Sequence, residues 1–277
     1  MRDLRGRNAI LTGASRGLGV TIARTLAREG INLALAARSK DDLERVRDEV
    51  VGLGVKAISV PTDVTDREAL GALVRQATDE LGPTDILVNN AGVEYVAPFH
   101  EYPPDDIESV VNVNLLAPML LTRFVLPGMI ERGRGQVVFV ASLAGKGGFP
   151  CEAPYAATKS ALITFNQTLR AELVDTPIGC SAVAPGFVAD DGMYARLAEG
   201  GIKAPRMLGT TTPGKVADAV LKAIRSNPAE LIVNPTPMRP LLALAEVFPG
   251  LIAPVQKWLG VTEFARRSAR AVDEGPV

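Results

Sequence analysis

Short apolar runs alternate with amphipathic segments along most of this chain, and that alternation limits its fold more than any other feature. The apolar runs predict strands at residues 8–12, 32–37, 55–60, 85–89, 136–141, 178–184 and 230–234. Segments with helical spacing lie between them, at 17–29, 39–53, 66–81, 105–129, 153–174 and 213–226. Strands that are apolar throughout are typical of a parallel sheet covered by helices on both faces. The sequence therefore predicts an α/β fold with a doubly wound parallel sheet.

A glycine-rich turn joins the first strand to the first helix. Glycine accepts backbone angles that other residues resist, and its missing side chain lets backbone N–H groups approach a pyrophosphate at a helix start. No Gly-Lys-Ser/Thr follows, so the turn is not a Walker A loop. A loop that only turns the chain would have the same composition, which leaves nucleotide binding open at this point. The candidate binding residues are Gly13, Ser15, Arg16, Gly17, Leu18 and Gly19.

The composition argues against several classes of function. Lys and Arg total 30 and Asp and Glu total 31, so no basic surface is predicted to hold nucleic acid. Cys151 and Cys180 are too few for a disulfide framework, and the single histidine, His100, argues against a histidine-rich metal site. We expect no metal, and we expect His100 to be a solvated loop residue. With no signal peptide and no uninterrupted apolar stretch of ~18 residues, we expect a cytoplasmic protein without a transmembrane segment.

Tyr155 and Lys159 form a Y-x-x-x-K pattern in the predicted helix 153–174. Residues four apart share a helix face, so the ammonium is expected to lower the pKa of the phenol and make it a general acid or base. The pattern is common by chance, and alone it favours two ordinary surface residues. Ser142 ends the preceding predicted strand and adds a hydroxyl that could bind the same substrate oxygen.

Together these motifs resemble the short-chain dehydrogenase/reductase family, over roughly residues 5–234. Asp63-Val64 resembles its adenine-contacting residues, Asn89-Asn90-Ala91-Gly92 its N-N-A-G turn, and Pro185-Gly186 its P-G turn near the nicotinamide. The resemblance implies a Rossmann-type domain that binds a nicotinamide cofactor, also through Val188, Tyr155 and Lys159. It also implies a reaction that interconverts a ketone or aldehyde and an alcohol.

The resemblance also assigns catalytic roles. Tyr155 would exchange a proton with the substrate oxygen, Ser142 would orient that oxygen, and Lys159 would hold the nicotinamide ribose and tune Tyr155. Asn114 resembles the family's fourth catalytic residue, which holds a water in a proton relay to the lysine. Asn112 is a less favoured alternative, because Asn114 directly precedes the apolar Leu-Leu-Ala stretch.

The end of the second predicted strand indicates which nicotinamide cofactor is used. An acidic residue there would bind the ribose hydroxyls of NAD, but this chain has Ala37 followed by Arg38. Arg16 in the glycine turn and Arg38 could clamp a 2′-phosphate by charge-assisted hydrogen bonds. We therefore expect NADP(H) rather than NAD(H). The alternative is that both arginines are ordinary solvated charges.

The predicted domain covers residues 1–236, with a substrate lid at 188–212 in which Asp190 stands where many family members have a threonine. Glu94, Cys151 and Glu152 fall near segments that border the substrate, and Cys151 is expected to be wall rather than nucleophile. Residues 237–277 form an apolar extension whose prolines forbid one long helix. It is expected to pack as short helices on the domain or on a neighbouring subunit. Alternatively, it covers an apolar substrate or touches a membrane.

Two other functions remain open from the sequence. One is a non-catalytic NADP(H)-sensing or interaction protein on the same fold, although such proteins often lack the tyrosine or lysine. The other is a sugar-nucleotide epimerase or dehydratase, which would carry a differently spaced glycine turn and a larger C-terminal domain. By resemblance, a homodimer or homotetramer is expected.

Overall fold

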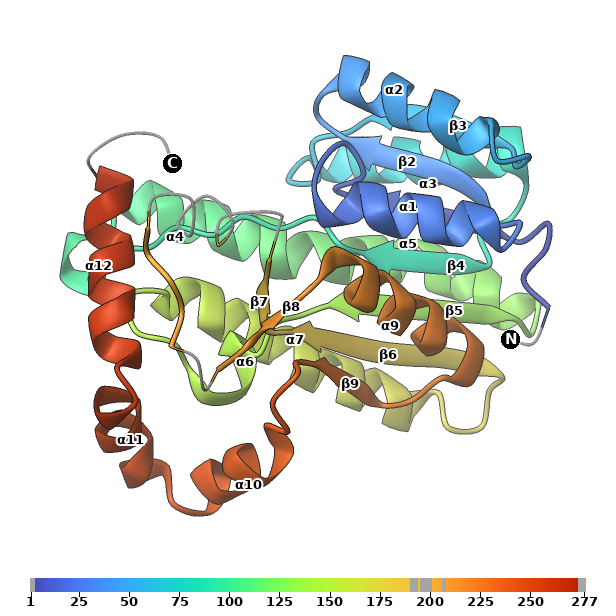
Figure 1. Ribbon diagram of the computed structural model, residues 1–277. Coiled ribbons are helices and arrows are strands. Elements are labelled where there is room, and N and C mark those ends of the chain that lie inside the picture. The colour runs from blue at the N-terminus through green and yellow to red at the C-terminus, as the bar shows by residue number, and fades with distance from the viewer. Residues whose placement is uncertain (1–2, 190–193, 195–200, 206–207, 274–277) are drawn as a thin grey trace.

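The computed structural model describes residues 3–189, 194, 201–205 and 208–273. In this part of the chain seven parallel strands form the main sheet, in the order β3-β2-β1-β4-β5-β6-β9. This arrangement confirms the predicted doubly wound α/β fold (Figure 1). The strands are β1 (Asn8–Thr12), β2 (Asn32–Ala37), β3 (Ala57–Pro61), β4 (Ile86–Asn89), β5 (Gly135–Val140), β6 (Ile178–Pro185) and β9 (Glu230–Val233).

Helices cover both faces of the sheet, because alternate strand residues point to opposite sides. Leu11 and Leu35 belong to the core under α1 (Leu18–Arg28), α2 (Lys40–Val51) and α9 (Pro213–Ser226). Ile10 and Ala34 belong to the opposite core, under α3 (Arg67–Leu81), α5 (Ala117–Glu131) and α7 (Ala153–Glu172). Both cores are almost wholly aliphatic, which accounts for the continuously apolar strand sequences.

The strand order reverses between β1 and β4, and this reversal positions the site. The chain leaves β1 toward β2 and β3, then returns to place β4 on the other side of β1. The connections that follow β1 and β4 therefore diverge, and a crevice opens beyond their carboxyl ends. The turn that begins at Gly13 and the turn that begins at Asn90 border this crevice.

The predicted helix 105–129 is continuous but not uniform. It consists of α4 (Pro104–Val111), the π-helical turn η2 (Asn112–Leu116) and α5. The N–H of Ala117 bonds to the carbonyl of Asn112, and Pro118 has no N–H with which to continue a regular ladder. The sequence pattern could not separate these turns, because one widened turn barely changes the spacing of apolar residues.

Among the described residues, Pro104–Glu131 is also the one helix long and apolar enough to cross a membrane by length and composition. In the structure it packs against the sheet, where Leu121, Val125 and Met129 are buried in the core. Asn112, Asn114 and Arg123 interrupt its sequence, so it contains no uninterrupted apolar stretch of the kind sought above. One helix of this kind is weak evidence for a membrane span.

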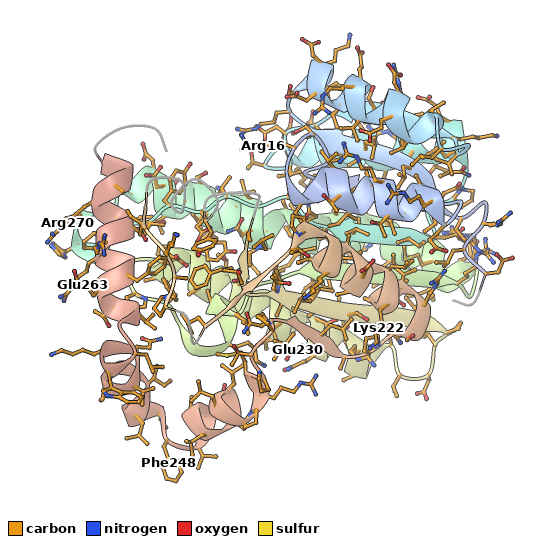
Figure 2. All side chains as sticks on the ribbon, in the orientation of Figure 1. Arg16, Lys222, Glu230, Phe248, Glu263 and Arg270 are labelled. Atoms are coloured by element: carbon orange, nitrogen blue, oxygen red, sulfur yellow. The ribbon has the colours of Figure 1, made fainter. Side chains whose placement is uncertain are left out.

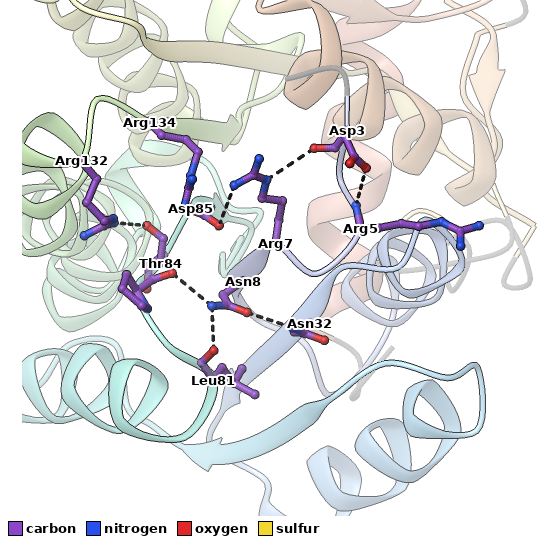
Figure 3. A network of polar contacts seen from close by, with 11 residues as sticks. Asp3, Arg5, Arg7, Asn8, Asn32, Leu81, Thr84, Asp85, Arg132 and Arg134 are labelled. Atoms are coloured by element: carbon purple, nitrogen blue, oxygen red, sulfur yellow. Dashed lines mark hydrogen bonds and ion pairs between the residues drawn. The ribbon is translucent and has the colours of Figure 1, made fainter.

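Polar side chains connect the amino ends of the strands, at the end of the sheet opposite the crevice (Figure 3). The buried carboxylate of Asp85 lies 2.8 Å from Arg134 Nε and 3.9 Å from Arg7 Nη1. Asn32 Nδ2 donates to Asn8 Oδ1 at 3.0 Å, and Asn8 Nδ2 donates to the carbonyl of Leu81 at 2.8 Å. These contacts join β1, β2 and the start of β4 at the end where the strands begin.

Several short elements lie beyond the sheet. They are η1 (Phe99–Glu101), α6 (Ala144–Gly147), the paired strands β7 (Phe187–Val188) and β8 (Thr210–Thr211), and the C-terminal α10 (Arg239–Val247), η3 (Pro249–Leu251), α11 (Ile252–Trp258) and α12 (Val261–Asp273). Thus β7 and β8 flank most of the predicted lid, whose Asp190 lies outside the described residues. Phe264 of α12 packs edge-on against Phe187 of β7, with ring centroids 5.5 Å apart.

His100 is exposed, as expected for a loop residue, with Nε2 3.1 Å from Glu101.

We predict that Gly19→Ala destabilises the protein, because a Cβ at this position would lie 2.0 Å from the carbonyl oxygen of Gly13. Such overpacking against backbone costs ~1–3 kcal/mol or more. Gly214→Ala, in the first turn of α9, is the matched control, since an added Cβ there meets nothing within 4 Å. It should leave stability unchanged or raise it by ~0.5–1 kcal/mol. Urea unfolding of both variants measures the difference, and equal stabilities would contradict the close packing.

Candidate active site

A cavity of ≈ 1340 Å³ extends from the carboxyl ends of β1 and β4 to the C-terminal helices. Its lining includes every residue that the sequence predicted for cofactor binding, together with Ser142, Tyr155 and Lys159. Of the predicted site residues only Asn114 is not on the wall. The cofactor-binding set comprises Gly13, Ser15, Arg16, Gly17, Leu18, Gly19, Arg38, Asp63, Val64, Asn90, Ala91, Gly92, Tyr155, Lys159, Pro185, Gly186 and Val188.

The glycine turn is held against the turn that follows β4. Thr12 Oγ1 accepts hydrogen bonds from the backbone N–H groups of Asn90 and Ala91, both at 3.0 Å. Asn90 Nδ2 donates to the carbonyl of Thr12 at 3.0 Å. A Cβ on Gly13, which has φ +67°, would lie 2.8 Å from Ala91 Cα. The two turns therefore form a cradle in which glycines bring the backbone to the cavity, and this fits a nucleotide pyrophosphate next to the start of α1.

Cationic groups surround the end of the cavity beside β2 and β3. The exposed side chains of Arg16 and Arg38 both line the cavity. Asp63 accepts hydrogen bonds from the N–H and the hydroxyl of Thr65, which lower its pKa, and nearby Arg38 lowers it further. The sequence interpretation missed Arg45, which reaches from α2 to donate to the carbonyl of Ser15 at 3.4 Å.

Ser142, Tyr155 and Lys159 come together from two elements. Ser142 follows β5, and its hydroxyl oxygen accepts the N–H of Ala144 at 3.1 Å while also hydrogen-bonding Tyr155. Lys159 Nζ donates to the carbonyl of Val140 at 3.0 Å and lies 5.5 Å from the centroid of the Tyr155 ring. A Cβ on Gly145 would lie 2.6 Å from the backbone of Lys159, so α6 and α7 pack in direct contact. This close packing fixes the serine relative to the tyrosine and lysine.

The direction of the Tyr155 pKa differs from the expectation. Burial raises the pKa of Tyr155 well above its ordinary value, and the carboxyl groups of Glu94 and Glu152 raise it further. Burial also lowers the pKa of Lys159 to about 8. The expectation of a lowered phenol pKa was therefore wrong for this environment, because burial and two acidic neighbours raise it.

Asn114 is fully buried in the π-helical turn and holds the loop after Gly92. Its Oδ1 accepts the N–H of Val93 and its Nδ2 donates to the carbonyl of Val93, both at 2.8 Å. A Cβ on Gly92 would lie 3.3 Å from Asn114 Oδ1 and 3.5 Å from Lys159 Nζ. Asn114 and Lys159 therefore lie on the same side of Gly92. One lone pair on Asn114 Oδ1 remains for a further donor.

Glu94 and Glu152 form a carboxyl pair on the cavity wall near Tyr155. Their side chains are hydrogen-bonded to each other, and Glu152 is buried. Burial and the neighbouring Glu94 raise the pKa of Glu152 well above its ordinary value, so the pair retains a shared proton. Cys151, with φ +65°, directs Glu152 into the wall, and its carbonyl accepts the N–H of Ala97 at 2.9 Å. Cys151 itself is not on the wall. The sequence placed these residues near the substrate but could not show the pairing.

Two further parts of the wall lie outside the predicted site residues; the sequence gave no signal for the first, whereas cover of an apolar substrate by the C-terminal extension was one of its two alternatives. Asn234 follows β9 and lies against Gly186. A Cβ on Gly186 would be 2.4 Å from Asn234 Oδ1. That buried oxygen has no hydrogen-bond partner within the described part of the chain. Apolar residues of α10–α12 form the end of the cavity farthest from the glycine turn, among them Leu242, Ile252, Val255, Leu259 and Phe264.

Comparisons with known proteins agree with this geometry. The short chain dehydrogenase family model matches residues 7–199. Ketoacyl reductase HetN of Nostoc sp. is 42% identical across 100% of this chain and 98% of its own length. Oxidoreductase UcpA of Escherichia coli is 37% identical over 68% of this chain and 72% of its own. A dehydrogenase/reductase SDR family protein 7-like of Drosophila melanogaster is 31% identical over 90% of this chain and 79% of its own. The chain therefore belongs to the short-chain dehydrogenase/reductase family, as an NAD(P)(H)-binding oxidoreductase that acts on CH–OH groups.

Proposed function

We propose that this protein uses NADP(H) to interconvert a ketone or aldehyde and an alcohol, with Tyr155 as the general acid or base. The observation that carries the proposal is the placement of Ser142, Tyr155 and Lys159 on the wall of the same cavity as the glycine cradle. A non-catalytic sensor would need the cradle but not this group of side chains.

The residues divide the chemistry of carbonyl reduction among themselves. When bound in the cradle, NADPH supplies the hydride, and the chain supplies the orientation and the proton. Tyr155 is held as a neutral phenol by its raised pKa, so it donates its O–H proton to the carbonyl oxygen as negative charge develops there. Ser142 donates a second hydrogen bond to that oxygen and stabilises it.

Lys159 and Asn114 complete the proton path in this proposal. Lys159, with its pKa lowered to about 8, exchanges protons near neutral pH and stabilises the tyrosinate left after transfer. Asn114 Oδ1 lies beside the same glycine as Lys159 Nζ and retains a lone pair for a water. Such a water would connect Lys159 to solvent.

The far end of the cavity supports an apolar substrate. Its wall is aliphatic and aromatic, contributed mainly by α10–α12. The name of the Nostoc relative, a ketoacyl reductase, denotes a ketone on an acyl chain. We therefore propose a ketone or alcohol on an apolar chain. The pair of Glu94 and Glu152 would accept a hydrogen bond from a hydroxyl or amide N–H near the reacting carbon.

The preference for NADP(H) is supported by charge. Ala37 has no side-chain acceptor for ribose hydroxyls, while Arg16 and Arg38 line the cavity nearby. Two guanidiniums favour a 2′-phosphate over neutral hydroxyls.

A homo-oligomer is part of the same proposal. Val111, Leu116, Met119 and Ile130 are exposed on the long helix 104–131 and would be covered in a contact between copies.

Replacement of Tyr155 by Phe should remove the proton donor and spare the cofactor site. We expect kcat for carbonyl reduction to fall by ~10²–10⁴-fold, with the Kd for NADPH unchanged. Tyr102→Phe is the matched control, since its hydroxyl donates to the carbonyl of Tyr95 at 3.0 Å and it is not on the cavity wall. Steady-state kinetics and calorimetric titration give both quantities, and full activity of the Tyr155 variant would contradict the proposed role.

Arg38→Ala should weaken NADPH binding selectively. Loss of a charge-assisted hydrogen bond costs ~1.5–3 kcal/mol, or about tenfold to a hundredfold in Kd. The Kd for NADH should change little, because it carries no 2′-phosphate. Titrations of both cofactors measure this ratio, with exposed Arg123→Ala as the control. An equal loss for both cofactors would remove the argument for NADP(H) and leave the oxidoreductase assignment intact.

Glu152→Gln should change how stability depends on pH. Because the folded-state pKa of Glu152 is raised above its ordinary value of 4.5, wild-type stability falls as the pH rises from that value through the folded-state pKa. Glutamine cannot ionise, so the variant lacks this loss. The lowered pKa of Lys159 makes stability rise with pH above about 8. This contribution is the same in wild type and variant, so it cancels in their difference. Melting curves from about pH 5 to about pH 9 should show the variant gaining ~2–4 °C over wild type, about 1 kcal/mol. A constant difference would contradict the buried pair.

A further inference from the structure

The segment α10–η3–α11 leaves an apolar surface uncovered. None of its side chains is buried in the structure, although its sequence is mostly apolar. Trp258 is 81% exposed, Val247 68% and Phe248 52%, with Leu251, Leu244 and Leu241 between 40% and 51%. We call these six residues the apolar tip. Figure 2 shows Phe248 at the extreme end of the molecule, away from the sheet.

The apolar tip is continuous with the substrate end of the cavity. Leu241, Leu244 and Leu251 belong to the tip and also line the cavity. The same short helices therefore present one side to the cavity and the other to the surroundings. An apolar molecule held against the tip would reach the cavity without crossing bulk water.

Charge around the tip indicates what covers it. Residues 239–273 contain five Lys or Arg and three Asp or Glu, in a chain whose net charge is −1. Lys257 lies on α11, and Arg266, Arg267 and Arg270 are exposed on α12, which leads away from α11; Arg270 lies toward the end of α12 farther from Phe248 (Figure 2). A symmetric contact with a second copy would bring these cations together, whereas an anionic lipid surface complements them. Exposed Trp and Phe beside Lys and Arg are typical of segments that insert shallowly at a bilayer interface.

We propose that the apolar tip docks this protein peripherally on an anionic membrane surface, with Phe248 and Trp258 inserted among the lipids and the α12 arginines on the headgroups. Docking opens the substrate end of the cavity toward the bilayer. The benefit to catalysis rests on the proposed apolar substrate, but the docking itself is measured without substrate or cofactor.

The experiment uses Trp258 as reporter, since it is the only tryptophan in the chain. The full-length protein is mixed with vesicles of equal parts phosphatidylcholine and phosphatidylglycerol, and separately with pure phosphatidylcholine vesicles. We expect a blue shift of tryptophan emission and co-sedimentation with the anionic vesicles, weakened by added salt. Absence of both signals would overturn the proposal, and equal binding to both vesicle types would overturn its electrostatic part.

Variants separate docking from other causes. The double variant Val247→Ser, Phe248→Ser keeps the reporter and should weaken vesicle binding by about tenfold or more, since it removes two apolar side chains that would be buried among the lipids. Val174→Ser is the matched control, because Val174 is 75% exposed but follows α7, outside the C-terminal helices. Unchanged binding by the double variant would overturn the assignment of the tip.

A second copy of the chain is the competing occupant. A blue shift that grows with protein concentration in the absence of vesicles, together with a larger sedimentation coefficient lost in the double variant, would assign the tip to a subunit contact and overturn the proposal. Thermal stabilisation by NADPH, measured on the same variants, reports separately on the proposed cofactor site.

Discussion

The contact between the turns after β1 and β4 is the constraint on which the rest of the structure depends. A single hydroxyl, that of Thr12, accepts two backbone N–H groups from the second turn. At Gly13 and Gly19 the backbone approaches neighbouring backbone atoms more closely than any side chain would allow. This contact fixes the relative positions of two strands whose connections diverge. The cofactor cradle and, through Gly92, the surroundings of Asn114 and Lys159 follow from it.

The two ends of the cavity are different chemical environments. Beside β2 the wall is open and cationic, with Arg16 and Arg38 exposed to solvent. Around Tyr155 the wall is enclosed, and burial controls ionisation more than any partner does. It keeps Tyr155 and Glu152 protonated and brings Lys159 close to deprotonation. A phenol with a raised pKa is a proton donor rather than an acceptor, which supports the proposed role of Tyr155 in carbonyl reduction.

Much of the fold could be predicted from the sequence, because strands buried on both faces and the glycine turn have local signatures. The π-helical turn at Asn112–Leu116 could not, since it alters hydrogen bonding without altering apolar spacing. The pairing of Glu94 with Glu152 joins two loops from different parts of the chain. The direction of the Tyr155 pKa depends on burial, which the Y-x-x-x-K spacing does not encode. The helices of the extension could be expected from its prolines, but their place in the cavity wall depends on tertiary packing.

The C-terminal helices give the architecture an evolutionary property. The family model ends at residue 199, whereas much of the apolar wall lies between Met238 and Ser268. The glycine turn and the apolar end of the wall are thus encoded at opposite ends of the gene. Mutation or recombination in the last stretch can remodel the substrate wall while the glycine cradle stays intact. With the apolar substrate proposed above, exchange of this stretch alone would change which substrates such an enzyme accepts.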